Sequence, residues 1–109
     1  MTFDEYQKKA RSTAIYPRLG QNIEYPTLGL CGEAGEVAEK VKKIHRDDGG
    51  KCTPEKRAAL KSEIGDILWY CGNLAVELGL TLEEIAQFNV EKLTSRQARG
   101  KLHGSGDDR

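Results

Sequence analysis

Two short acidic segments in this sequence could together hold a metal ion. Glu33 and Glu36 stand three residues apart in the first segment, and Glu63 and Asp66 stand three apart in the second, each pair enclosing a glycine. On a helix, residues i and i+3 are neighbours with Cβ atoms about 5–6 Å apart, so each segment presents two carboxylates side by side. One such pair is ordinarily a solvated helix edge, but two matched pairs favour a shared metal site.

Apolar residues at helical spacing accompany both acidic pairs and predict how the two segments pack. At about 100° per residue they form one narrow stripe on each helix. Relative to its stripe, each acidic pair lies at the same edge. Two helices packed antiparallel through these stripes would direct four carboxylates into one space. The stripes consist of Leu30, Ala34, Val37, Val41 and Ile44, and of Leu60, Ile64, Ile67, Cys71, Leu74 and Leu78.

The four carboxylates favour a hard cation as their ligand. Oxygen donors without cysteine or histidine select Mg²⁺, with Mn²⁺ as a possible substitute, over Zn²⁺. Magnesium usually binds through a few carboxylates together with substrate phosphates, so a phosphate ester or anhydride is the expected substrate. Such an ion neutralises phosphate charge and lowers the pKa of an attacking water.

Further polar side chains follow the acidic pairs by one or two turns and are candidate substrate contacts. Lys40 and Lys43 follow the first pair, where they could meet phosphate oxygens. Tyr70 and Asn73 follow the second pair, where they could meet a sugar or a base. The alternative for the lysines is a solvated helix edge, and for Tyr70 a place covering the core.

Composition narrows the class of protein. The chain has 109 residues with 17 basic and 17 acidic side chains, so no net charge attracts it to a nucleic acid polymer or an anionic membrane. No apolar run approaches the roughly 20 residues of a membrane span. The first residues are polar, so we expect no signal peptide and a cytoplasmic location. Three cysteines without a close pair argue against a disulfide framework or a zinc site.

Capping signals divide the chain into four helices. Thr2 with Glu5 and Thr81 with Glu84 are predicted capping boxes, and Gly79 suits a left-handed helix end. We therefore expect one all-α domain spanning residues 1–109, a four-helix bundle whose two central antiparallel helices carry the acidic pairs. Residues 100–109 form either a flexible end or a strap that closes over substrate phosphates. The expected helices are roughly 3–14, Tyr25 or Pro26 to 46, 54–79 and 81–98.

The acidic segments resemble those of a known family, the MazG-like nucleotide pyrophosphohydrolases of the all-α NTP pyrophosphatase superfamily. The resemblance extends from about Leu28 to Arg96. Its first block is LGLCGEAGEV from Leu28, its second is EIGDILWY from Glu63, and its third is Asn89-x-x-Lys92-Leu93-x-x-Arg96. The first two blocks match the E-x-x-E and E-x-x-D metal motifs of the family, at a family-like separation.

The resemblance implies Mg²⁺-dependent hydrolysis of a nucleoside triphosphate, ribo- or deoxy- and including non-standard ones, to the monophosphate and pyrophosphate. Within it, Glu36 is the residue expected to orient the attacking water. Many members carry a further glutamate where this chain has Gly32, which leaves the number of metal ions and the general base open. The implied metal ligands are Glu33, Glu36, Glu63 and Asp66, the implied phosphate contacts are Lys92 and Arg96, and the implied further substrate contacts are Asn89 and Tyr70.

The fourth helical segment predicts self-association. Phe88 falls away from the side that carries Leu82 and Ile85, so this segment is apolar over more than one face. We expect a homodimer or homotetramer with active sites completed between chains, and the resemblance implies the same. Two alternatives stay open: a non-catalytic helical module that binds nucleotide or metal, and an enzyme like phosphoribosyl-ATP pyrophosphohydrolase.

Overall fold

The fold is entirely helical. The computed structural model describes all residues, 1–109, and contains no strand. The all-α class and the number of helices confirm the sequence prediction, although the first and third helices each end two residues earlier than expected. No helix combines the length and the hydrophobicity that crossing a membrane requires. The helices are α1 (Phe3–Ser12), α2 (Glu24–Asp47), α3 (Pro54–Glu77) and α4 (Leu82–Ala98).

Threonines begin three of the four helices, including the predicted Thr2 and Thr81, although at Thr2 only the bond to the threonine side chain forms and the predicted capping box is incomplete. The side chains of Thr2, Thr53 and Thr81 each accept a hydrogen bond from the backbone N–H three residues on, at 3.1, 3.2 and 3.0 Å. Glu84 returns a bond to the N–H of Thr81 at 3.0 Å, which completes a capping box. Gly79 has a φ of +70° just after α3, the left-handed conformation that glycine adopts without steric cost.

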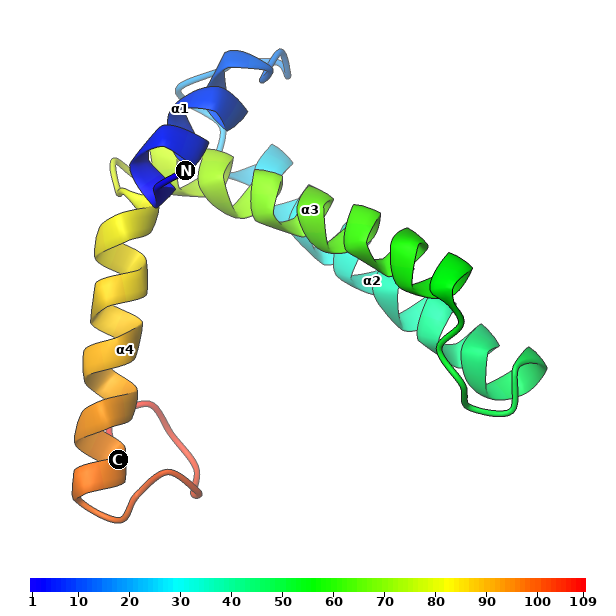
Figure 1. The fold of residues 1–109 in the computed structure, drawn as a ribbon. Helices are drawn as coiled ribbons and strands as arrows, with labels where there is room; N and C mark the ends of the chain where they lie inside the picture. Colours follow the sequence, from blue (N-terminus) through cyan, green and yellow to red (C-terminus); the bar gives the residue numbers. More distant parts are fainter.

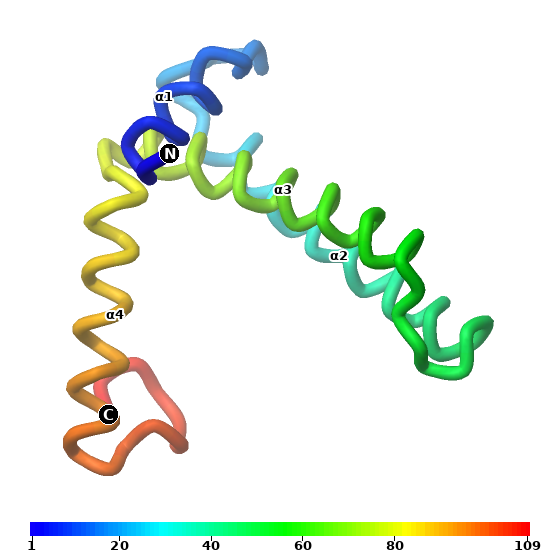
Figure 2. Tube along the Cα trace, viewed as in Figure 1, coloured from blue at the N-terminus to red at the C-terminus, as the bar shows by residue number.

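The helices form an open angle. Helices α2 and α3 run antiparallel as a long hairpin, and α4 diverges from it at the apex where α1 lies (Figures 1 and 2). Helix α4 makes no contact with α2. The radius of gyration is 16.7 Å, against about 13 Å for a compact domain of this length. Only 12 of the 109 residues are buried, so a single chain leaves much of its apolar surface uncovered.

The seam between α2 and α3 differs from the predicted stripes, because the acidic residues lie within it. Spacings of three and four residues alternate along the half-buried or buried positions of both helices. Ala34 and Val41, expected in the seam, are exposed, as is Ile64 at 57%. A repeat averaging 3.5 residues is the signature of two helices that coil about each other. The seam positions are Leu30, Glu33, Val37, Lys40 and Ile44 in α2, and Leu60, Glu63, Ile67, Tyr70 and Leu74 in α3.

A buried glutamine fixes the start of α4. The side chain of Gln7, on α1, donates to the carbonyls of Gly72 and Leu80 at 3.3 and 3.0 Å. Its carbonyl oxygen accepts the N–H of Leu82 at 2.9 Å. One side chain thus satisfies the backbone groups of the turn between α3 and α4, and α4 leaves the apex in a defined direction.

A second polar cluster holds the connector between α1 and α2. The Glu77 side chain is fully buried and receives Arg11 at 2.7 Å and the Tyr16 hydroxyl at 2.9 Å. The backbone N–H groups of Gly20 and Asn22 donate to the same carboxylate at 2.9 and 2.6 Å. Burial alone would raise the pKa of Glu77, but the hydrogen bonds from Asn22, Arg11, Gly20 and Tyr16 lower it to about 2.

Replacing Glu77 by glutamine should destabilise the fold by about 3 kcal/mol, the low end for a broken buried pair, because the Glu77 carboxylate is fully buried but the Arg11 side chain is 23% exposed. The pKa of Glu77 is depressed in the folded state, so its stabilising effect is complete above about pH 5 and is lost as the pH falls towards 2. Urea unfolding of wild type and Glu77→Gln from pH 7 to pH 3 measures the difference, which should shrink at the acid end. Glu24→Gln, at an exposed ion pair of 3.8 Å, is the control. Equal losses in the two variants would contradict the assignment.

Candidate metal centre

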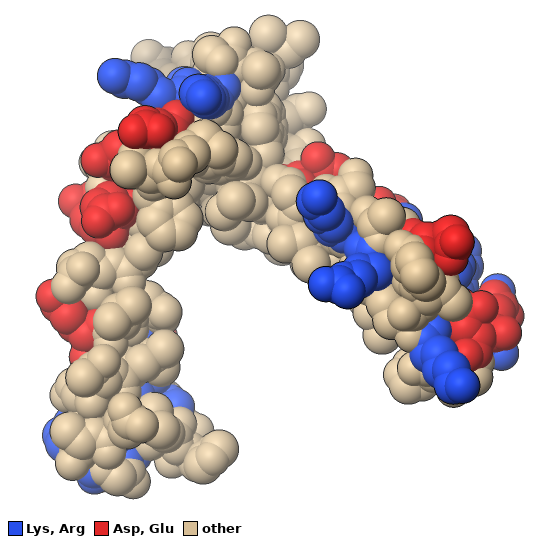
Figure 3. All heavy atoms as spheres, in the orientation of Figure 1, with Lys and Arg blue, Asp and Glu red and all other residues tan.

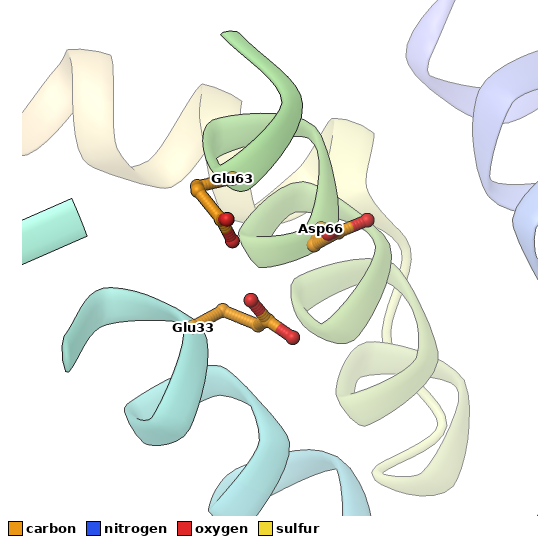
Figure 4. A group of neighbouring side chains, drawn as sticks. All are labelled: Glu33, Glu63 and Asp66. Carbon is orange, nitrogen blue, oxygen red and sulfur yellow. The ribbon is translucent and has the colours of Figure 1, made fainter. Parts of the chain in front are cut away.

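Three carboxylates meet between α2 and α3. Glu33 comes from the third turn of α2, and Glu63 and Asp66 come from the middle of α3. One oxygen of each lies within 4.8 Å of one oxygen of the others. Glu33 and Glu63 point towards each other across the seam, with Asp66 one turn along α3 (Figure 4). The antiparallel pairing therefore brings together acids from both predicted motifs.

Lys40 already supplies a positive charge to these acids. Its Nζ lies 3.0 Å from Glu63 and 3.9 Å from Glu36, at the next seam position after Val37. The lysine side chain is 29% exposed and that of Glu63 only 17% exposed, so this contact is shielded more than an ordinary surface pair. Lys40 was predicted as a phosphate contact, and in this structure it neutralises part of the acidic cluster.

The pKa shifts express the same balance of charge. A hydrogen bond shared with Glu63 is the main reason that the pKa of Glu33 is raised, with burial and the charge of Asp66 adding to it. The hydrogen bond from Lys40 lowers the pKa of Glu63, and the bond with Glu33 lowers it further. Bonding to Glu63 raises the pKa of Lys40. Negative charge is thus concentrated between the helices and a cation is favoured there.

The donor set fits a hard divalent cation. All three groups are carboxylates, the ligands that Mg²⁺ prefers, and none is a thiol or an imidazole. Oxygens on opposite sides of a bound Mg²⁺ are about 4.2 Å apart, so the observed spacing needs only small side-chain rotations. The ion would be held by Glu33, Glu63 and Asp66. Water would fill its remaining coordination positions, where phosphate oxygens could replace it.

Glu36 stands apart from this cluster. Its side chain is 59% exposed and reaches the other acids only through Lys40, at 3.9 Å. The structure therefore brings together three of the four predicted ligands. The physical reason is the rotation of α2 about its axis, which places Glu33 and Lys40 in the seam and leaves Glu36 on the solvent side.

An aromatic wall flanks the acids on the side of the apex. Tyr70, one turn after Asp66, lies against the backbone of Gly29, where an added Cβ would overlap its ring. The ring of Tyr25 lies 6.4 Å from that of Tyr70, and Trp69 meets Tyr70 edge to face at 5.0 Å. Burial raises the pKa of the Tyr70 hydroxyl. The sequence reasoning missed Gly29 and Tyr25; a glycine in the seam opposite an aromatic residue was the available signal.

Asn73 faces away from the acids, contrary to the prediction of a substrate contact. Its side chain is completely buried. The amide oxygen accepts from Arg11 at 3.2 Å, and the amide nitrogen donates to the carbonyl of Trp69 at 3.1 Å. One turn beyond Tyr70, the α3 surface is covered by α1, so this position belongs to the core.

The predicted phosphate contacts lie on α4, away from the carboxylates. Asn89 is exposed, the Lys92 side chain is 30% exposed, and that of Arg96 is 5% exposed. Helix α4 does not touch α2, so one chain does not bring these groups to its own acidic cluster. Lys43, also considered from the sequence, makes an ion pair of 3.8 Å with Glu39.

Comparison with known proteins identifies relatives of the chain. The model of the MazG nucleotide pyrophosphohydrolase domain matches residues 21–100, which include α2, α3 and α4. The Gene 37 protein of Mycobacterium phage L5 is 48% identical over 114 aligned residues, which cover the whole of both chains. No solved structure matches the chain significantly.

Two glycine substitutions in α2 should change stability in opposite directions. Gly29→Ala places a methyl group in the Tyr70 ring and should cost about 1–3 kcal/mol through overpacking. Gly32→Ala meets open space and should gain roughly 0.5–1 kcal/mol, because alanine favours a helix. Urea unfolding followed by fluorescence of Trp69, which contacts Tyr70, measures both changes. A Gly29→Ala variant as stable as Gly32→Ala would show that the ring does not occupy this position.

Proposed function

The chain belongs to the MazG nucleotide pyrophosphohydrolase family, and from this premise we propose that it hydrolyses a nucleoside triphosphate to the monophosphate and pyrophosphate with Mg²⁺. The substrate class includes ribo- and deoxynucleotides and non-standard ones. The observation that carries the proposal is the convergence of Glu33, Glu63 and Asp66 within 4.8 Å between the two helices that the family model covers. A purely structural hairpin gains nothing from like charges in its seam.

The proposed division of labour starts from the acids. Glu33, Glu63 and Asp66 would hold Mg²⁺, which would neutralise phosphate charge and lower the pKa of water. Glu36 extends to solvent one turn away and orients the attacking water as the fourth acid of the motifs. The water oxygen bonds to the α-phosphorus as the bond to the bridging oxygen breaks. The monophosphate keeps the hydroxyl, pyrophosphate leaves, and the second proton of the water goes to Glu36.

The remaining parts of the site bind the substrate. Lys40, 3.0 Å from Glu63, would bind a phosphate oxygen of the substrate beside the acids. Tyr70, held against Gly29, offers its ring to the sugar or base. Lys92, Arg96 and Asn89 contact the phosphates and the rest of the nucleotide from α4, which requires α4 to meet an acidic cluster.

We propose that α4 of a second copy of the chain lies beside the acidic cluster. Helix α4 exposes Phe88 at 67% and Val90 at 58%, and the hairpin exposes Ile64 at 57% and Leu68 at 37%. The acidic side chains of the first half of α4 lie on its outer side, and in this view the inner side of that half shows no charged side chain (Figure 3). Two uncovered apolar faces on one small chain fit a homodimer or homotetramer in which α4 of one copy covers the hairpin of another.

Product analysis tests the proposed reaction. With Mg²⁺ and a panel of nucleoside triphosphates, phosphorus NMR should show the monophosphate and pyrophosphate as the first products, and chelator should abolish turnover. Glu63→Gln should lower the rate at limiting Mg²⁺ by about 100-fold while the helical circular dichroism stays unchanged. Glu39→Gln, whose carboxylate pairs with Lys42 at 2.9 Å outside the cluster, is the control. Orthophosphate as the first product, or full turnover by Glu63→Gln, would refute the proposal.

Mixing two inactive variants tests whether sites are shared between chains. Glu63→Gln removes a metal ligand of the hairpin, and Lys92→Ala removes a phosphate contact of α4. If each site combines one hairpin with the α4 of another copy, random exchange of subunits should restore activity to about one quarter of wild type. Mixtures that stay inactive although light scattering shows exchanged oligomers would contradict the shared site, as would a fully active monomer.

A further inference from the structure

The last ten residues fold back and close on the basic end of α4. Gly100 and Gly106 have φ of +67° and +83°, which allow the chain to reverse where other residues would be strained. The guanidinium of Arg109 donates to the carbonyls of Lys101, Leu102 and Gly106 at 3.1, 3.0 and 2.7 Å. The terminal residue therefore ties residues 100–109, here called the tail, into a closed loop.

This loop places one acidic residue on both proposed phosphate contacts of α4. A guanidinium nitrogen of Arg96 donates to the Asp107 carbonyl at 2.6 Å and lies 3.5 Å from its carboxylate. Lys92 Nζ lies 3.8 Å from the same carboxylate. The Arg96 side chain is only 5% exposed, and it contacts the backbone carbonyl oxygen and a carboxylate oxygen of Asp107. The tail thus occupies donors that a phosphate group would need.

The surroundings of Lys92 and Arg96 carry more cationic than acidic side chains. Charged side chains change sign along α4, from acidic in its first half to basic at its end (Figure 3). A cavity of about 360 Å³ opens between the end of α4 and the tail. Its cationic lining residues are Lys92, Arg96, Arg99 and Arg109, and its acidic ones are Glu91, Asp107 and Asp108.

We propose that the tail is an internal competitor, in which Asp107 holds Lys92 and Arg96 until a phosphate group of the nucleotide displaces it. The inference rests on the proposed function, because it takes phosphate as the ligand of these two cations. The Asp107 side chain is 90% exposed, and exposed ion pairs are weak, so an anion of higher charge can replace it. Displacement frees the tail from Arg96 and leaves the closed loop of Arg109 intact.

The test compares two neighbouring acids of the tail. Asp107→Asn removes the charge on Lys92 and Arg96, whereas Asp108→Asn removes the same charge from a residue that contacts neither. Calorimetric titration with inorganic pyrophosphate, in chelator and low salt, should show binding about two- to five-fold tighter for Asp107→Asn than for wild type. Asp108→Asn should bind as wild type does. Equal affinities of the two variants, or no binding by any of the three proteins, would overturn the proposal.

Order in the tail provides a second measurement. The heteronuclear NOE of the Asp107 and Asp108 amides should fall when pyrophosphate is added to the wild type, because these residues lose their contact with Arg96 and move on the nanosecond timescale while Arg109 stays bound to Arg99. Amides that remain as ordered at saturation would overturn the proposal. Both measurements are made without Mg²⁺ and nucleotide. The proposal about the tail can therefore hold even if the chain does not hydrolyse nucleotides, and it can be refuted even if hydrolysis is confirmed.

Discussion

The facing glutamates of the α2–α3 seam impose the constraint on which the other features depend. Glu33 and Glu63 occupy positions where a hairpin of this kind would ordinarily place apolar side chains, and they repel each other. Lys40 offsets that repulsion from the next seam position, 3.0 Å from Glu63. The middle of the hairpin is therefore prepared for a cation at the expense of stability, as is usual for functional sites.

Polar contacts between α1 and the apex stabilise the fold where the α2–α3 seam does not. Gln7 and Arg11 stand four residues apart on one face of α1, and they bind the α3–α4 turn and Glu77. Hydrogen bonds are directional, so this arrangement sets the angle of α4 without an apolar interface along its length. The open angle that results leaves apolar faces available to another chain.

Separation of charge follows from the same geometry. The whole chain is electrically neutral, but the cluster of Glu33, Glu63 and Asp66 lies in the hairpin, whereas Lys92 and Arg96 lie near the end of α4. Within one chain the two groups do not meet, because α4 touches α2 nowhere. Each group finds a local counter-ion instead, Lys40 for the acids and Asp107 for the bases. Both counter-ions stand at the proposed metal and phosphate sites, so each proposed site is partly neutralised by a residue of the chain itself.

The sequence by itself determined the helices, their caps and the identity of the acids. These depend on neighbours within a few residues, such as Thr81 with Glu84 or Glu63 with Asp66, and local spacing is visible in a single chain. Only the tertiary structure decided which acids converge. The predicted and observed stripes of α2 share Leu30, Val37 and Ile44 and the same average repeat, but the helix is rotated about its axis so that Glu33 instead of Ala34 lies in the seam and Glu36 stays outside it. The burial of Asn73 and the direction of α4 also depend on the tertiary structure. Helix α1, more than sixty residues away in the sequence, covers Asn73 and binds the start of α4 through Gln7.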